Sequence, residues 1–108
     1  MSAYLLANIT VNNPENYKEY VEKVKSIVEK FDGQYLVRGG EMSVIEGDWP
    51  HKRNIVIKFP SREKAMEWYN SEEYKPIRQI RHDNAVSNSI IVDGCLLYTS
   101  DAADEKVR

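Results

Sequence analysis

An arginine followed by two glycines, Arg38-Gly39-Gly40, is the sequence feature most suited to chemistry. A guanidinium offers several hydrogen-bond donors in one plane and matches a carboxylate or another anion. The two glycines would allow the backbone to approach a ligand closely. We therefore predict that Arg38 contacts an anion. The alternative is a salt bridge from Arg38 to Glu46 or Asp48 that holds the following loop in place.

Two further arginines, Arg78 and Arg81, stand three positions apart in a predicted helical segment and so project from neighbouring faces. They could reach the region of Arg38 or coat the surface. His82 follows near the end of that segment, where the helix dipole stabilises an imidazolium. Because histidine titrates near neutral pH, His82 is a candidate catalytic proton donor, together with Tyr74. A structural or surface role is the alternative for His82.

Three aromatic residues, Trp68, Tyr69 and Tyr74, occur in the same part of the chain. Such side chains either pack in the core, where they bury a large area, or form the wall of a ligand pocket between helices and sheet. Asn8 belongs to a mixed polar and apolar face of the first predicted strand, which is typical of a pocket or an interface. The predicted ligand-binding residues are therefore Arg38, Asn8, Trp68, Tyr69 and Arg78.

Several classes of function are not indicated. The sequence has no phosphate-binding loop, GxSxG or HExxH motif. Its only histidines are His51 and His82 and its only cysteine is Cys95, so we predict no metal site, no cofactor and no intrachain disulfide. The formal net charge of −2 gives no reason to expect nucleic acid or an anionic membrane as a partner. We expect no signal peptide and no membrane span, and hence a cytoplasmic protein.

The periodicity of apolar residues predicts the elements that must position these side chains. Two-residue alternation predicts strands over 4–11, 34–38, 53–59 and 86–92. Helical spacing predicts a long helix from Pro14, a second helix over about 61–70 and a short helical segment after Ser71. Asn13 is the expected cap of the long helix and Gly33 its expected left-handed C′ residue. Residues 42–46 could pair back or extend the sheet edge.

The resulting order, β-α-β-β-α-β, is that of an α+β ferredoxin-like protomer: an antiparallel sheet with both helices on one face. The other face of the sheet would be bare. Its expected residues, including Leu6, Val56 and Ile91 or their neighbours, are too apolar for water. A second copy packed sheet to sheet would cover them, so we predict a homodimer.

Several motifs resemble one family. They are YLVRGG at 35–40, IEGDWP at 45–50, FPSREKAMEWY at 59–69, SEEY at 71–74 and Ile77-Arg78. Together they are similar to the family called domain of unknown function 1330, a branch of the dimeric α+β barrel superfamily, over residues 3–94. The resemblance implies a ferredoxin-like protomer and a two-subunit dimeric α+β barrel. It implies no reaction, because the activity of the family is not established.

More distant members of that superfamily include cofactor-independent monooxygenases, which place Asn, Trp, Tyr and Arg around an aromatic substrate. Asn8, Trp68, Tyr74 and Arg38 offer the same side-chain types. The leading hypothesis is a homodimeric domain that binds a small anionic or aromatic ligand, with enzymatic activity left open. The alternatives are a cofactor-independent monooxygenase-like enzyme and a non-catalytic stress or interaction module.

The end of the chain has a different character. Residues 95–105, CLLYTSDAADE, resemble the translation of a transposon-end adaptor used to prepare sequencing libraries. We therefore expect one domain over 1–94 and a non-native or disordered tail over 95–108, derived from an untrimmed metagenomic read. The alternative is a genuine flexible tail. On the adaptor hypothesis, Cys95 carries no functional weight.

Overall fold

The computed structural model describes residues 1–94, in which four strands form one antiparallel sheet. The strands are β1 (Ala3–Val11), β2 (Gln34–Arg38), β3 (Arg53–Phe59) and β4 (Ala85–Asp93). Their spatial order is β2-β3-β1-β4, so the two central strands are β1 and β3. The predicted ferredoxin-like α+β fold is confirmed. The predicted tail lies outside the described residues.

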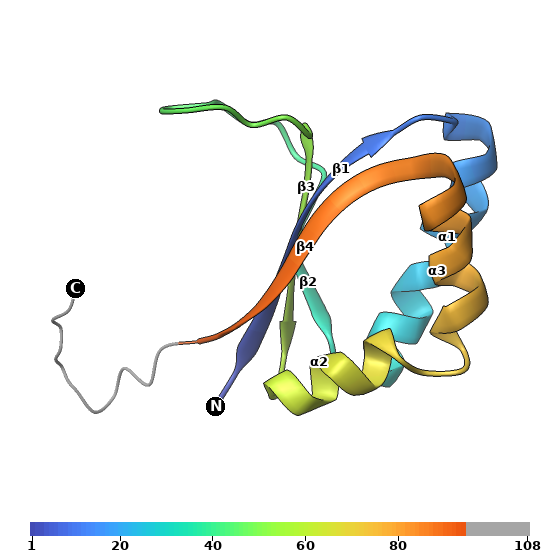
Figure 1. Cartoon of the computed structure of the whole chain (residues 1–108). Helices are drawn as coiled ribbons and strands as arrows, with labels where there is room; N and C mark the ends of the chain where they lie inside the picture. The colour runs from blue at the N-terminus through green and yellow to red at the C-terminus, as the bar shows by residue number, and fades with distance from the viewer. Residues whose placement is uncertain (95–108) are drawn as a thin grey trace, which may run out of the picture.

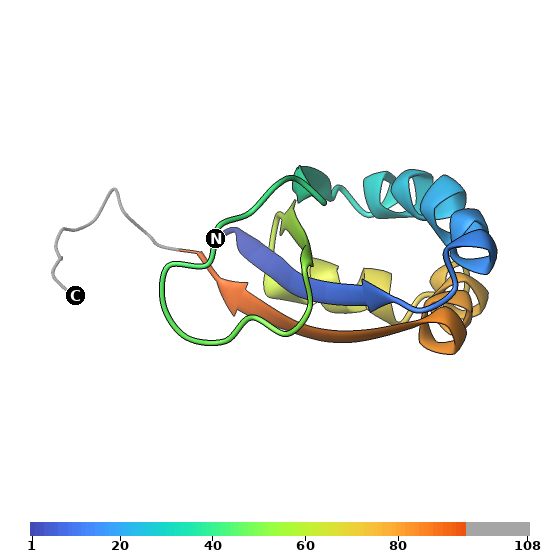
Figure 2. The ribbon, with the colours of Figure 1, turned by 90° about the horizontal axis from the view of Figure 1, so that it is seen from above.

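Three helices cover one face of this sheet (Figure 1): α1 (Pro14–Lys30), α2 (Arg62–Tyr69) and α3 (Tyr74–Asn84). The core lies between the helices and the sheet, where Val28, Ile57, Phe59, Trp68 and Tyr74 are among the most deeply buried side chains. Figure 2 shows the same two layers from above. None of these helices is long and apolar enough to cross a membrane.

The long helix α1 begins as predicted, because the side chain of Asn13 accepts a hydrogen bond of 3.2 Å from the Asn16 amide. Its end differs from the prediction. Asp32, and not Gly33, is the left-handed C′ residue, with φ of 65°. The amides of Asp32 and Gly33 donate to the Glu29 and Val28 carbonyls respectively, which is a Schellman motif. Gly33 is one position further along, where its lack of a side chain serves packing.

Residues 42–46 do not form the predicted additional strand. They lie in a segment between β2 and β3 that has no helix or strand, and Val44 and Ile45 are exposed. Gly39 and Gly47 both have φ of 75°, a conformation that interrupts an extended strand. The segment extends away from the helices, on the opposite side of the sheet (Figures 1 and 2).

The connection between α2 and α3 is a short turn organised by Ser71. Its hydroxyl donates to the Trp68 carbonyl at 2.9 Å and accepts from the Tyr74 amide at 3.2 Å. This turn brings Trp68 and Tyr74 together, with ring centroids 4.2 Å apart. The predicted second helix and the predicted helical segment after it are therefore present as α2 and α3.

Candidate functional site

A cavity lies between the helix-covered face of the sheet and the helices. Leu5, Ala7 and Ile9 of β1 contribute to its lining from the sheet, and Tyr17 and Tyr20 contribute from α1. Its volume is about 40 Å³. One water needs about 10–15 Å³ of such space, so the cavity has room for about three waters. A small molecule fits this site better than a large one.

Arginine and tyrosine provide nearly all the polar lining of the cavity. The lining includes Arg38, Arg53, Arg81, Tyr17, Tyr20, Tyr35, Tyr69 and Tyr74, together with the indole of Trp68 and the hydroxyl of Ser89. Among residues 1–94, no aspartate, glutamate or histidine lines it. Within residues 1–94, the salt bridges all involve other cations than these three arginines. The cavity therefore concentrates positive charge that the described part of the chain does not neutralise.

Arg81 is the most deeply buried of the three arginines, with only 6% of its surface exposed. Its Nη1 donates to the Ser87 hydroxyl at 2.6 Å. Close by, the hydroxyls of Tyr20 and Tyr74 form a buried hydrogen bond of 2.8 Å. Burial lowers the pKa of Arg81, but the neighbouring Tyr74 and Tyr20 raise it by more, so this guanidinium keeps its charge. An isolated buried charge is costly, and an anion would relieve that cost.

Arg38 and Arg53 lie on the β2–β3 side of the cavity. Nη2 of Arg38 donates to the Val21 carbonyl of α1 at 2.8 Å, and its guanidinium stacks 4.7 Å from the Tyr35 ring centroid. Glu46 and Asp48 form no salt bridge with Arg38, so the alternative explanation of this arginine is not supported. Nε of Arg53 is buried without a hydrogen-bond partner among residues 1–94.

Three tyrosines of the cavity, Tyr17, Tyr20 and Tyr35, have a raised pKa. Burial raises the pKa of Tyr35 to about 12. Burial, followed by the neighbouring Tyr74, raises the pKa of Tyr20 well above its ordinary value. Burial also raises the pKa of Tyr17, although Arg53 opposes the change. These phenols therefore remain protonated at neutral pH, and together with the guanidinium groups they can donate to the oxygens of an anion.

Four of the predicted site residues lie together in this cavity: Arg38, Trp68, Tyr69 and Tyr74. Trp68 and Tyr74 serve both of the roles considered for them, because they are core residues that also form the cavity wall. The indole Nε1 of Trp68 is buried without a hydrogen-bond partner among the described residues. It is thus another donor that a ligand oxygen could satisfy.

Asn8 does not join this group, because it lies on the other face of the sheet. The strand register places it directly between Asn54 of β3 and Asn88 of β4, in one row of three amides. This row lines a separate hollow of about 280 Å³, together with Trp49. The Trp49 indole donates to the Asn54 side-chain oxygen at 2.8 Å. Asn8 Oδ1 is buried and has no partner within residues 1–94.

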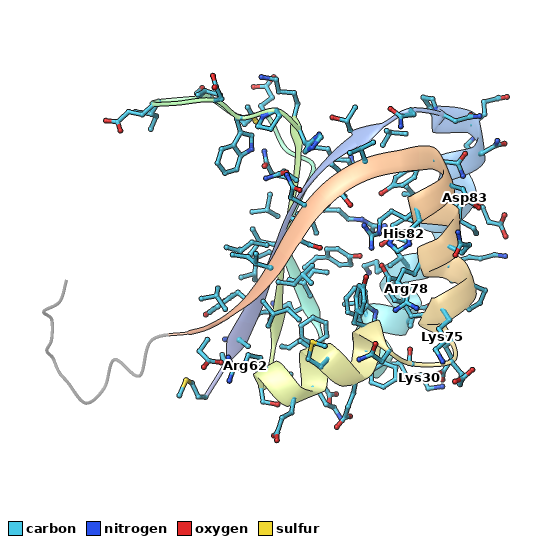
Figure 3. The ribbon with its side chains drawn as sticks, viewed as in Figure 1. Lys30, Arg62, Lys75, Arg78, His82 and Asp83 are labelled. Atoms are coloured by element: carbon cyan, nitrogen blue, oxygen red, sulfur yellow. The ribbon has the colours of Figure 1, made fainter. Side chains whose placement is uncertain are left out.

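Arg78 and His82 come from α3 (Figure 3), and neither lines the arginine cavity. Arg78 contacts Tyr69 instead. Its Nη1 donates to the Tyr69 carbonyl at 2.7 Å, and its guanidinium lies 4.7 Å from the centroid of the Tyr69 ring. His82 is exposed. Its pKa is lowered by desolvation and by the neighbouring charges of Arg81 and Arg78, which disfavour the imidazolium.

The family of the chain follows from a comparison with protein-family models. The model described as "Domain of unknown function (DUF1330)" matches residues 2–95. The chain belongs to this family. The family resemblance of the sequence motifs is therefore confirmed. A search of curated protein sequences found no significant match.

Solved structures of similar fold are more distant in sequence. One is RPA0582 of Rhodopseudomonas palustris, a protein of unknown function, with TM-score 0.72 and 17% identity over 87% of this chain and 82% of that chain. Another is SnoaB, a cofactor-independent oxygenase of Streptomyces nogalater, with TM-score 0.58 and 7% identity over 92% and 98%. A putative antibiotic biosynthesis monooxygenase of Caulobacter crescentus has TM-score 0.61 and 11% identity over 87% and 90%. These similarities show the fold alone.

Sequence reasoning missed four residues as contributors to this cavity: Tyr17, Tyr20, Tyr35 and Arg53. Arg81 was expected either to reach the region of Arg38 or to coat the surface, and it lines the same cavity as Arg38. A signal was present for some of them. Tyr17 and Tyr20 repeat at helical spacing on the buried face of α1, and Arg53 shares the face of Ile55 and Ile57 on β3. A phenol or a guanidinium on a core-facing stripe needs a polar partner, which marks these positions as more than core.

Proposed function

We propose that this domain is a homodimer that binds a small organic anion in the cavity between its sheet and its helices. The observation that carries the proposal is that three arginines line the cavity, whereas no carboxylate of the described residues does. Buried charges in proteins are normally paired. The hydrogen-bond acceptors of Arg38 and Arg81 include the neutral Val21 carbonyl and Ser87 hydroxyl, so a bound anion would supply the counter-charge.

The volume of the cavity favours an aliphatic anion over an aromatic one. About 40 Å³ is well below the roughly 150 Å³ of an engineered cavity that holds benzene. A benzene ring would therefore require side chains to move. Small carboxylates of two to four carbons match the site as it stands, because their oxygens can accept from guanidinium and phenol donors together.

A thermal-shift measurement tests the proposal. A ligand that binds only the folded state at 100 times its Kd stabilises that state by about 2.7 kcal/mol, which raises the Tm of a small domain by several degrees. We expect this shift with small carboxylates and a much smaller one in Arg38→Met. Arg62→Met is the matched control, because Arg62 is an exposed arginine of α2 outside the cavity, and it should respond like the wild type.

The result that would contradict anion binding is the absence of any shift with small carboxylates, or equal shifts in wild type and Arg38→Met. In that case the non-catalytic module becomes the better description. Small aldehydes and phenols, tested in the same way, then probe for uncharged ligands. Equal ionic strength in all samples removes non-specific salt effects.

Enzymatic use of the same cavity is a second candidate, favoured by the position of Tyr74. Its hydroxyl is hydrogen-bonded to Tyr20 and close to Arg81, so it could donate a proton while the guanidinium stabilises negative charge on oxygen. A cofactor-independent oxygenase is the version suggested by the fold of SnoaB. Oxygen uptake with small phenols, which would require cavity side chains to move, would support it if the uptake is lost in Tyr74→Phe. His82 is disfavoured as the proton donor, because it lies outside the cavity.

Self-association is the second part of the proposal, and it rests on the bare face of the sheet. Leu6, Val86, Ile90 and Val92 lie exposed on that face, and Val56 is half-buried there. Ile91 was expected on this face together with Leu6 and Val56. Its neighbour Ile90 lies there instead, because Ile91 packs against the core. A second copy is the simplest cover for a self-complementary apolar surface of this kind.

A further inference from the structure

The arrangement of the cations suggests a more specific ligand than a single carboxylate. Ile9 of β1 pairs with Arg53 of β3 on one side and with Ser87 of β4 on the other, so these three residues form one row across the sheet. Adjacent strands are about 4.8 Å apart, which places Arg53 and Ser87 about 10 Å apart along that row. Arg81 is hydrogen-bonded to Ser87 and therefore belongs to the β4 side.

The first cationic pole lies on the β2–β3 side of the cavity and consists of Arg38 and Arg53. The Arg53 guanidinium lies against Gly39, directly after Arg38. A Cβ at Gly39 would stand only 2.3 Å from Nη1 of Arg53. Arg38 is fixed by its hydrogen bond to the Val21 carbonyl. With Nε of Arg53 buried and unpartnered within residues 1–94, this pole has donors that are free to bind.

The second pole consists of Arg81 and the Tyr20–Tyr74 pair. Arg81 is nearly fully buried and is hydrogen-bonded to a neutral serine hydroxyl. Only one proton of the Tyr20–Tyr74 pair is needed for the 2.8 Å bond between the two hydroxyls. The other hydroxyl hydrogen can donate to a ligand. This second group of donors is anchored on the β4 side of β1, whereas Arg53 is anchored on the β3 side.

We propose that the cavity binds a short dicarboxylate, with one carboxylate at Arg38 and Arg53 and the other at Arg81 with Tyr20 and Tyr74. This inference rests on the proposed anion-binding function and narrows it to a dianion. A monocarboxylate would leave one pole uncompensated, whereas a dianion pairs both. The room for about three waters, which occupy about 90 Å³ in the liquid, suits a two- or three-carbon dicarboxylate such as oxalate or malonate.

Titration calorimetry with oxalate, malonate, glutarate and acetate tests the proposal, at constant ionic strength and pH 7. For the wild type we expect malonate or oxalate to bind at least tenfold more tightly than acetate, and glutarate to lose this advantage because it is too long. In Arg81→Met, the dicarboxylate affinity should fall to within threefold of the acetate affinity. Acetate itself should change by less than threefold, because the first pole remains. Arg62→Met, a change of an exposed arginine on α2, should leave all affinities unaltered.

Two results would overturn the dianion site while leaving anion binding in place. One is equal affinity for acetate and malonate in the wild type. The other is an equal loss of both ligands in Arg81→Met. If Arg81→Met does not fold, as judged by circular dichroism, Arg53→Met makes the same comparison from the first pole. The absence of binding by any of the four anions would instead refute the proposed function itself.

Discussion

At the residue scale, Gly39 leaves room for the guanidinium of Arg53, a residue fourteen positions later in the chain. Its φ of 75° and its contact with the Arg53 guanidinium both require the absence of a side chain. Gly39→Ala would place Cβ at 2.3 Å from Nη1 of Arg53, so the guanidinium must move. We expect a severalfold loss of carboxylate affinity in calorimetry. Stability should fall by about 1–2 kcal/mol, because an L-residue in this conformation is strained.

Gly40→Ala is the matched control, because a Cβ at Gly40 meets nothing within 4 Å and the residue does not have positive φ. This variant should bind carboxylates like the wild type. Equal affinity in Gly39→Ala and Gly40→Ala would show that Arg53 is not positioned by this turn. The comparison also separates the ligand effect from the general cost of losing a glycine in the loop.

For individual residues, the sequence indicated which kinds of side chain belong to the site better than it indicated the direction in which each side chain points. The Arg-Gly-Gly turn was identified, but its glycine makes room for Arg53, a residue that had no assigned role. Asn8 was assigned to the site from its residue type and from the mixed face of its strand, but that face lies opposite to Leu5 and Ile9 and so faces away from the cavity. Arg78 and Arg81 are three apart on a helix but differ in surroundings, because Arg81 contacts Ser87 of the sheet and Arg78 contacts Tyr69 of α2.

At the scale of the elements, helix α1 places Tyr17 and Tyr20 at the cavity, and its C-terminal end is packed tightly against the core. Gly33 follows its left-handed residue, and a Cβ there would lie 2.6 Å from Val28 Cγ1 and 2.8 Å from the Phe59 ring. Gly33→Ala should therefore destabilise the domain by about 1–3 kcal/mol through overpacking. Urea unfolding followed by circular dichroism measures the change.

Asp32→Gly is the informative counterpart. Asp32 has positive φ, and glycine adopts that conformation without steric cost, so stability should stay equal or rise by up to about 1 kcal/mol. The opposite pattern, with Asp32→Gly strongly destabilising and Gly33→Ala neutral, would mean that Gly33 is the C′ residue after all. The sequence favoured Gly33 only because glycine is the commonest residue at C′.

Strands and helices were otherwise predicted closely, since each buries one face and so has a clear period. β3 has the predicted bounds, Arg53–Phe59, and β1 begins one residue earlier than expected. The segment from 39 to 52 was harder, because its apolar residues Val44 and Ile45 suggested a strand yet are exposed. A strand needs a neighbouring strand to pair with, and within residues 1–94 none pairs with this segment. The apolar pattern of the segment does not reveal this.

At the scale of the whole molecule, the two faces of the sheet differ. One face forms the cavity together with the helices, and the other carries an exposed apolar surface. Ile90 is 58% exposed and pairs with Leu6, which is 37% exposed, near the middle of that surface. Such a patch on a small domain is normally covered by a partner. A twofold interface would use this surface on both copies, so each substitution would count twice.

We therefore expect the wild type to sediment as a dimer at micromolar concentration, and Ile90→Lys to sediment as a folded monomer. The substitution would bring two buried ammonium groups into one interface, where neither has a carboxylate partner, and burial of such charges is strongly unfavourable.

Met66→Lys is the control, because Met66 is 44% exposed on α2, on the helical side of the molecule. It should remain a dimer. A monomeric wild type, or a dimer that tolerates Ile90→Lys, would refute association through this face. The cavity lies between sheet and helices within one protomer, so a folded Ile90→Lys monomer should still bind carboxylates, and this makes assembly and ligand binding separable by experiment.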